Sequence, residues 1–137
     1  MPKAGDILFH KEWVFDDGEI APKLLVILNT PVDIDTPYLV LKTTKNPKWY
    51  SGVKSGCNPD KKVFFVLKVD EPCFDIDTYI QLPNIREITT TDLLRGCFSK
   101  IIVPINAVSI SCFQRLKNCL KNFKYDISLK HQKLIFG

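Results

Sequence analysis

The fold is decided by residues 5–45, which read GDILFHKEWVFDDGEIAPKLLVILNTPVDIDTPYLVLKTTK. Residues 6–10 and 13–15 form a first extended segment rich in apolar and aromatic side chains. Asp16, Asp17 and Gly18 then interrupt it with a strong turn signal. The segment therefore predicts a β-hairpin close to the N-terminus.

The apolar run at residues 24–28 follows this hairpin directly. It lies between Pro22 and the sequence Asn29-Thr30-Pro31, and such a bounded run is typical of a strand buried on both faces. A further strand is expected at residues 38–44, ending in two threonines. These features indicate the opening strands of a small β-barrel, with residues 24–28 as its central strand.

The rest of the chain predicts short strands followed by a helix. The strands are expected at residues 63–69, 78–82, 85–91 and 99–105. Apolar side chains recur at helical spacing from 109 to 123, with Ser109 available as N-cap. Asp126 or Ser128 is expected to cap a shorter final turn. The prediction is a mainly β (α+β) domain with a C-terminal amphipathic helix at about 109–123.

Length and composition fit one domain covering residues 1–137, because 45% of the residues are hydrophobic. No apolar run reaches 18 residues and the N-terminus lacks a signal pattern, so we expect a soluble, cytoplasmic protein without membrane association. The five cysteines are odd in number and include no Cys-x-x-Cys pair, which favours a reducing compartment. Most are expected to be buried thiols, with Cys57 the accessible one.

The net charge of +4 is unevenly distributed along the chain. Seven lysines between Lys42 and Lys68 are opposed only by Asp60, and most lie in or beside a long loop expected at residues 45–60. Lysines interleaved with aromatic residues suit single-stranded nucleic acid, whose bases can stack. The alternative is a solvated lysine-rich loop. The residues expected to bind RNA are Lys42, Lys45, Lys48, Trp49, Tyr50, Lys54, Lys61 and Lys62.

The order of motifs in the first third of the chain resembles the MazF/PemK family of growth-inhibitor toxins. The resemblance rests on four features in order. They are Gly5-Asp6-Ile7 with Phe9, then Phe15-Asp16-Asp17-Gly18, then Pro22-Lys23 directly before an apolar strand, and last a strand ending in Thr43-Thr44. It implies an SH3-like barrel and a dimeric, metal-independent endoribonuclease that cleaves single-stranded RNA. It also implies neutralisation by an antitoxin protein with an acidic segment.

The resemblance also implies the catalytic positions. Metal-free cleavage uses a ribose 2′-hydroxyl as nucleophile, so the protein must orient the chain and stabilise charge on the phosphate. Thr43 matches the family's threonine, with Thr44 beside it, whereas the family's arginine falls on Pro22 or Lys23. Lys23 offers a point charge instead of a bidentate fork. Lys23, Thr43 and Thr44 are therefore the predicted catalytic residues, and no metal or cofactor is expected.

Other chemical groups are less specific in their spacing. His10 and His131 could transfer protons near neutral pH, but no motif joins them. The acidic residues, including Asp75 and Asp77, lack a metal-binding spacing. Two alternatives to the nuclease remain open: a non-catalytic barrel that binds nucleic acid or a protein partner, and a toxin that acts on a protein target.

Overall fold

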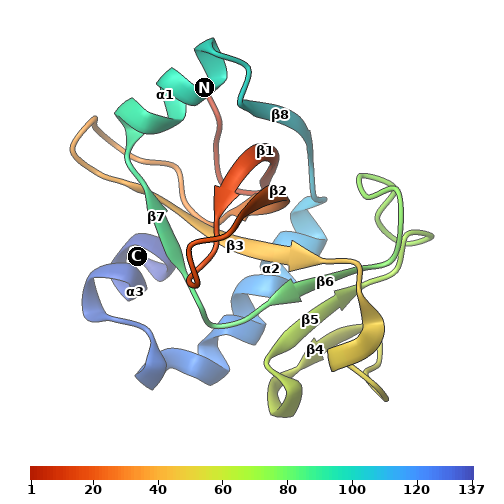
Figure 1. Ribbon diagram of the computed structural model, residues 1–137. Coiled ribbons are helices and arrows are strands. Elements are labelled where there is room, and N and C mark those ends of the chain that lie inside the picture. The colour runs from red at the N-terminus through yellow and green to blue at the C-terminus, as the bar shows by residue number, and fades with distance from the viewer.

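The computed structural model describes residues 1–137, which form an eight-stranded antiparallel sheet with three α-helices (Figure 1). The strands are β1 (Asp6–Val14), β2 (Ile20–Ile27), β3 (Tyr38–Thr44), β4 (Gly56–Asn58), β5 (Val63–Val66), β6 (Thr78–Gln81), β7 (Arg86–Ile88) and β8 (Ile102–Ala107). The helices are α1 (Thr90–Phe98), α2 (Ile110–Leu120) and α3 (Leu129–Phe136), with 3-10 turns η1 (Pro47–Trp49), η2 (Pro59–Lys61) and η3 (Lys121–Asp126).

The sheet has the strand order β4-β5-β6-β3-β2-β1-β8, and β7 pairs with β3. A closed barrel requires its two outermost strands to pair. Here β4 contacts α2 and β8 contacts α1 instead. The predicted closure into a barrel is therefore wrong, because helices cover the two strands that would have to meet.

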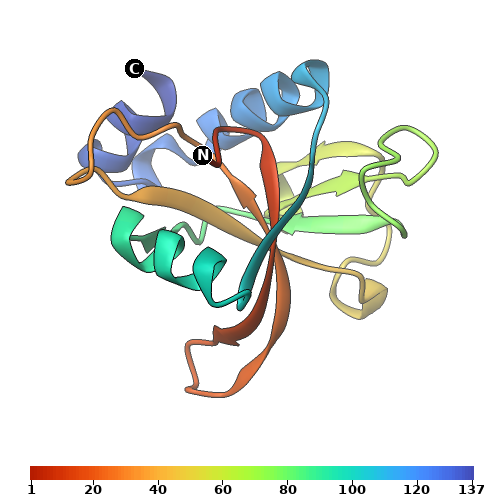
Figure 2. The same cartoon turned by 90° about the horizontal axis from the view of Figure 1, so that it is seen from above.

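Helices lie on both sides of the central strands, as Figure 2 shows: α1 lies on one side of β3, and α2 and α3 lie on the other. Side chains alternate between the faces of a strand. Leu39 and Leu41 accordingly pack in the core beneath α2 and α3, whereas Tyr38 and Val40 pack in the second core, to which Leu93 of α1 belongs. The predicted burial of the run at 24–28 is confirmed for residues 25–28.

Most of the predicted elements are present. β3 has the predicted bounds, and the turn at 16–18 joins β1 to β2. The predicted helix is α2 with Ser109 as its N-cap, but it ends at Leu120 and continues as η3. The final turn extends into the full helix α3, which Ser128 caps. Helix α1 was not predicted, and residues 85–91 supply only the short strand β7 before it begins.

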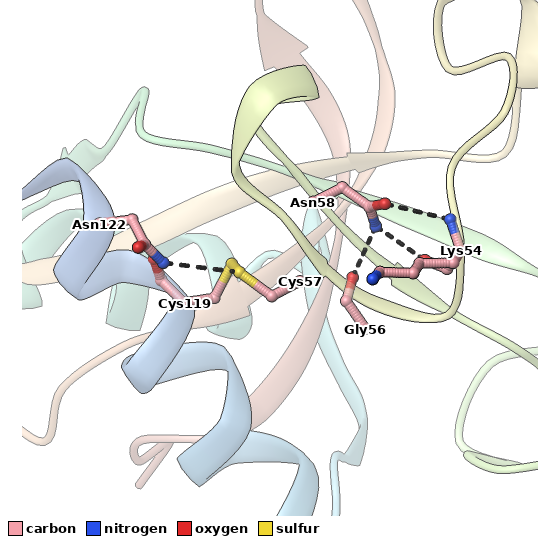
Figure 3. The surroundings of a disulfide bond; sticks show 6 residues. All are labelled: Lys54, Gly56, Cys57, Asn58, Cys119 and Asn122. Atoms are coloured by element: carbon pink, nitrogen blue, oxygen red, sulfur yellow. Dashed lines mark hydrogen bonds between the residues drawn. A yellow bond between two sulfur atoms is a disulfide. The ribbon is translucent and has the colours of Figure 1, made fainter.

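A disulfide joins Cys57 of β4 to Cys119 of α2, as Figure 3 shows, with 5.5 Å between their Cα atoms. The prediction that Cys57 is an accessible thiol is therefore wrong. Cys73, Cys97 and Cys112 are free. Disulfides are rare in the cytosol, so this bond removes the cysteine argument for a cytoplasmic location, which stays a prediction. None of the helices has the length and apolar character needed to cross a membrane.

Candidate nucleic-acid interface

Two lysines from neighbouring strands converge on the face of the sheet that carries α1. The Nζ atoms of Lys23 in β2 and Lys42 in β3 lie 5.4 and 6.0 Å from the ring centroid of Phe15. Phe15 packs against the core on this face. Ammonium groups at this distance are attracted to the face of an aromatic ring. One phenyl ring therefore holds two positive charges close together, and neither forms an ion pair with an acid.

The environment lowers the pKa of Lys23 below its usual value of 10.5. Partial burial is the main cause, and the neighbouring Lys42 ammonium adds to it. Keeping Lys23 protonated in the folded protein therefore costs free energy, and a bound anion would offset that cost. An RNA phosphate is one such anion.

Replacing Lys42 by methionine should raise the pKa of Lys23 toward 10.5, because one of the two causes of its depression disappears. The return should be incomplete, since burial remains. An NMR titration of the Lys23 side chain measures the shift. In the wild type the Lys23 pKa is lower in the folded protein than in the unfolded chain. Between these two pKa values the unfolded chain binds more protons, so the contribution of Lys23 to the unfolding free energy should rise with pH across that interval. An unchanged Lys23 pKa in the variant would contradict the proximity of the two ammonium groups.

A row of side chains continues from Lys42 across the sheet. Thr44 pairs with Tyr79 of β6, and Tyr79 pairs with Phe65 of β5. Directly opposed residues in an antiparallel pair share a face, and Thr44 shares its face with Lys42 two positions earlier. The row therefore runs from the lysines to two aromatic rings.

The aromatic rings form a stack of three. Tyr79 lies between Phe65 and Tyr50, with ring centroids 4.4 and 5.0 Å apart and interplanar angles of 12° and 19°. The hydroxyl of Tyr50 accepts a hydrogen bond of 3.0 Å from Gln81 Nε2, which fixes its ring. Tyr79 is buried, while Phe65 and Tyr50 are partly exposed. We call Tyr50, Tyr79 and Phe65 the aromatic stack. We call Lys23 and Lys42, which lie over Phe15, the lysine pair.

The loop that follows β3 carries the other predicted RNA-binding residues. Lys45, Lys48, Trp49 and Lys54 are exposed, and Lys48 Nζ lies 5.2 Å from the centroid of the Trp49 ring. The loop is anchored at its end by Asn58, whose side chain bonds Lys54 and Gly56 (Figure 3). Lys61 and Lys62 are also exposed but belong to the turn between β4 and β5. None of these lysines forms an ion pair.

Thr43 occupies the opposite face from the lysine pair. It is buried, and its Oγ1 donates a 3.0 Å hydrogen bond to the carbonyl oxygen of Leu24. Thr44 lies in the row with Tyr79, and its Oγ1 accepts from the backbone of Asn46 at 3.2 Å. Lys23 and Thr43, which the family resemblance places at one phosphate, therefore present their functional groups to different faces.

A pocket of about 480 Å³ lies on the Thr43 side of the sheet, where the end of β3 is beside the first half of β2. Phe9, Leu24 and Ile105 supply apolar wall, and Thr43 and Asp75 supply polar groups. Lys23, Thr44, Lys45 and Asn46 border it as well, so the loop bearing the lysines begins at its rim. All three predicted catalytic residues thus border one cavity, although the Lys23 ammonium itself lies over Phe15.

The wall that carries Asp75 is held by a buried carboxylate. Glu71 accepts hydrogen bonds from the backbone nitrogen and the hydroxyl of Ser109, at 2.8 and 2.9 Å. It thereby ties the segment between β5 and β6 to the N-terminus of α2, where a negative charge is favoured. Burial, with the Glu71 charge, raises the pKa of nearby Cys73 to about 11, so this thiol stays protonated at neutral pH.

Sequence reasoning missed Phe15, Phe65, Tyr79 and Asp75 as members of the site. The available signals were the apolar run at 63–66 for Phe65 and the alternation at 78–82 for Tyr79. It also missed Arg86, which pairs with Val40 on the lysine-pair face. Arg86 lies 4.7 Å from the Trp13 ring centroid and forms a 3.1 Å ion pair with Asp16. This arginine is already engaged within the fold.

The two histidines are not brought together. His10 lies on β1, where burial lowers its pKa. His131 lies on α3, with its Nε2 2.6 Å from Glu87 Oε2. No cluster of three His, Cys, Asp or Glu side chains has a metal-binding arrangement.

Searches of protein-family models and of curated proteins find no match to the chain. The resemblance to the MazF/PemK family stays a prediction.

Proposed function

We propose that this protein binds single-stranded RNA across the lysine pair and the aromatic stack. The observation that carries the proposal is the row from Lys42 and Thr44 to Tyr79 and Phe65, which sets unpaired cations beside partly exposed rings on one face. Sequence-tolerant binders of single strands combine these two elements: cations follow the phosphates, and rings stack with the bases.

Double-stranded RNA fits this face less well. Its bases are stacked within the helix and cannot reach side-chain rings, and its recognition depends on shape and on backbone contacts. The site therefore favours unpaired strands. The lysines of the loop after β3 would extend the electrostatic contact beyond the aromatic stack.

A metal-independent endoribonuclease is the second candidate. It is favoured by the lowered pKa of Lys23, because a lysine with a lowered pKa can exchange a proton closer to neutral pH. In this arrangement Lys23, Lys42 and Thr44 would act together on the phosphate, since the Thr43 hydroxyl is bonded to Leu24. An acidic antitoxin segment covering the lysines would then inhibit the enzyme.

The test is fluorescence anisotropy with a labelled single-stranded RNA of about 12 nucleotides, within the usual range for one binding module. The buffer contains a chelator, and the salt concentration is varied. The wild type should bind, and Lys23→Ala with Lys42→Ala should flatten the slope of log K against log salt by about 1.4, roughly 0.7 for each lost phosphate contact.

The matched control is Lys124→Ala with Lys133→Ala, which removes the same charge from exposed positions in η3 and α3. An equal loss in both double variants would show non-specific attraction and count against the proposal. A gel of the same samples examines cleavage. Discrete cuts that disappear in the Lys23/Lys42 variant and in Thr44→Ala would favour the nuclease, and binding without cuts would favour the binding protein.

A further inference from the structure

The pocket beside the end of β3 and the first half of β2 has the dimensions and lining for one unstacked nucleobase. Its volume of about 480 Å³ lies within the range usual for small-ligand sites. The ring of Phe9 and the side chains of Leu24 and Ile105 offer apolar surface to a planar ring. The rest of the lining includes the polar or charged side chains that would determine which base enters: Lys23, Thr43, Thr44, Lys45, Asn46, Asp75 and Thr78.

Asp75 is the only acidic side chain of the pocket, and it forms no ion pair. Its neighbour Asp77, by contrast, accepts a 2.8 Å hydrogen bond from the backbone of Lys68. An ionised carboxylate only accepts hydrogen bonds, and it can accept two side by side. Asp75 therefore suits a base edge that presents two adjacent donors.

Guanine is the base with this edge, because its N1–H and its 2-amino group point in the same direction. Adenine and cytosine each present one amino group beside a ring nitrogen that accepts, and uracil presents one N–H between two carbonyls. Facing a carboxylate, those acceptors would be repelled. Single-stranded RNA is commonly read through such Watson–Crick edges.

The path from the proposed RNA surface to the pocket is short along the chain. β3 ends at Thr44, which belongs to the row with the aromatic stack, and Lys45 and Asn46 then form part of the pocket rim. Lys45 is exposed and unpaired, so it can hold the phosphate of a nucleotide that turns over this strand end.

We infer that the pocket lined by Phe9, Leu24 and Ile105 takes one guanine of the bound RNA, with Asp75 accepting hydrogen bonds from its N1–H and 2-amino group. This inference rests on the proposed function and adds to it a preferred base. Thr43, buried on this face, is then part of the pocket that receives the base.

The experiment compares oligouridine with the same oligomer carrying a single central guanosine, inosine, adenosine or cytidine, by fluorescence anisotropy. Guanosine should tighten binding about 10-fold over adenosine, because about 1.4 kcal/mol, the equivalent of a tenfold change, lies within the range that a good bidentate contact contributes. Inosine lacks only the 2-amino group and should lose most of the gain. Asp75→Asn should abolish the guanosine preference, so that the guanosine and adenosine oligomers bind equally.

Two further variants make the result specific to the pocket. Asp70→Asn makes the same charge change on the same segment, outside the pocket lining, and should keep the preference. Ile105→Trp fills part of the pocket and should likewise remove the guanosine preference. Equal affinity for all five oligomers, or a preference that survives Asp75→Asn, would overturn the inference but leave the proposed function standing. Failure to bind any oligomer would overturn both.

Discussion

Replacing Tyr50 and Phe65 together by leucine should weaken binding of single-stranded RNA by roughly 10- to 100-fold. These are the outer rings of the aromatic stack, and each is partly exposed. Base stacking on a protein ring is worth about 1–3 kcal/mol per base, and about 1.4 kcal/mol corresponds to a factor of ten. Leucine keeps apolar contact with Tyr79, so the fold should be retained. Anisotropy with the 12-nucleotide RNA measures the loss.

The control for this experiment is Tyr125→Leu. Tyr125 lies in η3 and is fully exposed, so its loss removes a tyrosine without touching the sheet. It should bind RNA as the wild type does. If the Tyr50/Phe65 variant also binds normally while its circular dichroism is unchanged, the stack has no part in recognition and the proposed function loses its principal support.

Removing the disulfide by Cys57→Ala with Cys119→Ala should lower the free energy of unfolding by about 4 kcal/mol. The bond joins residues separated by 62 positions, and closing a loop of that length restricts the unfolded chain by about this amount. Urea denaturation with and without a reductant measures the effect. Reductant should lower the unfolding free energy of the wild type to about that of the variant. It should leave the unfolding free energy of the variant unchanged.

Cys97→Ala serves as the control, because Cys97 is a free and only partly buried thiol. This variant should keep the sensitivity to reductant. A wild type whose unfolding curve does not respond to reductant would contradict the bond. The bond also matters for the interface, since Gly56 beside Cys57 is paired with Phe65 of the aromatic stack. Reduction should therefore weaken RNA binding modestly, through the loosened β4 edge.

Strands were easier to predict from this sequence than the first helix. Continuous apolar runs such as 24–28 and 38–41 can be recognised locally, whereas α1 contains threonines and Gly96, which disfavour a helix. The packing of this segment against β8 stabilises the helix. A Cβ atom at Gly96 would lie 2.5 Å from Cδ1 of Ile102, so glycine is what permits α1 to lie against β8. That contact cannot be seen in the sequence of either segment.

The candidate site shows the same division between local and long-range information. The lysines around residues 42–62 are visible as a cluster of charge, but their aromatic partners depend on the pairing of β3 with β6, more than 30 positions further along the chain. Register also separates Thr43 from Thr44. A single position decides which face each threonine occupies, and a motif match cannot supply it.

The most direct test of the central claim is an NMR titration of the protein with a single-stranded oligouridine. Tyr50, Phe65, Tyr79, Lys23 and Lys42 lie on one face, so their signals should shift together and at the same RNA concentration. Signals from α3, which lies on the opposite side of β3, should stay in place. Shifts confined to α3, or no shifts at RNA concentrations that saturate the anisotropy signal, would contradict the assignment of this face as the RNA-binding surface.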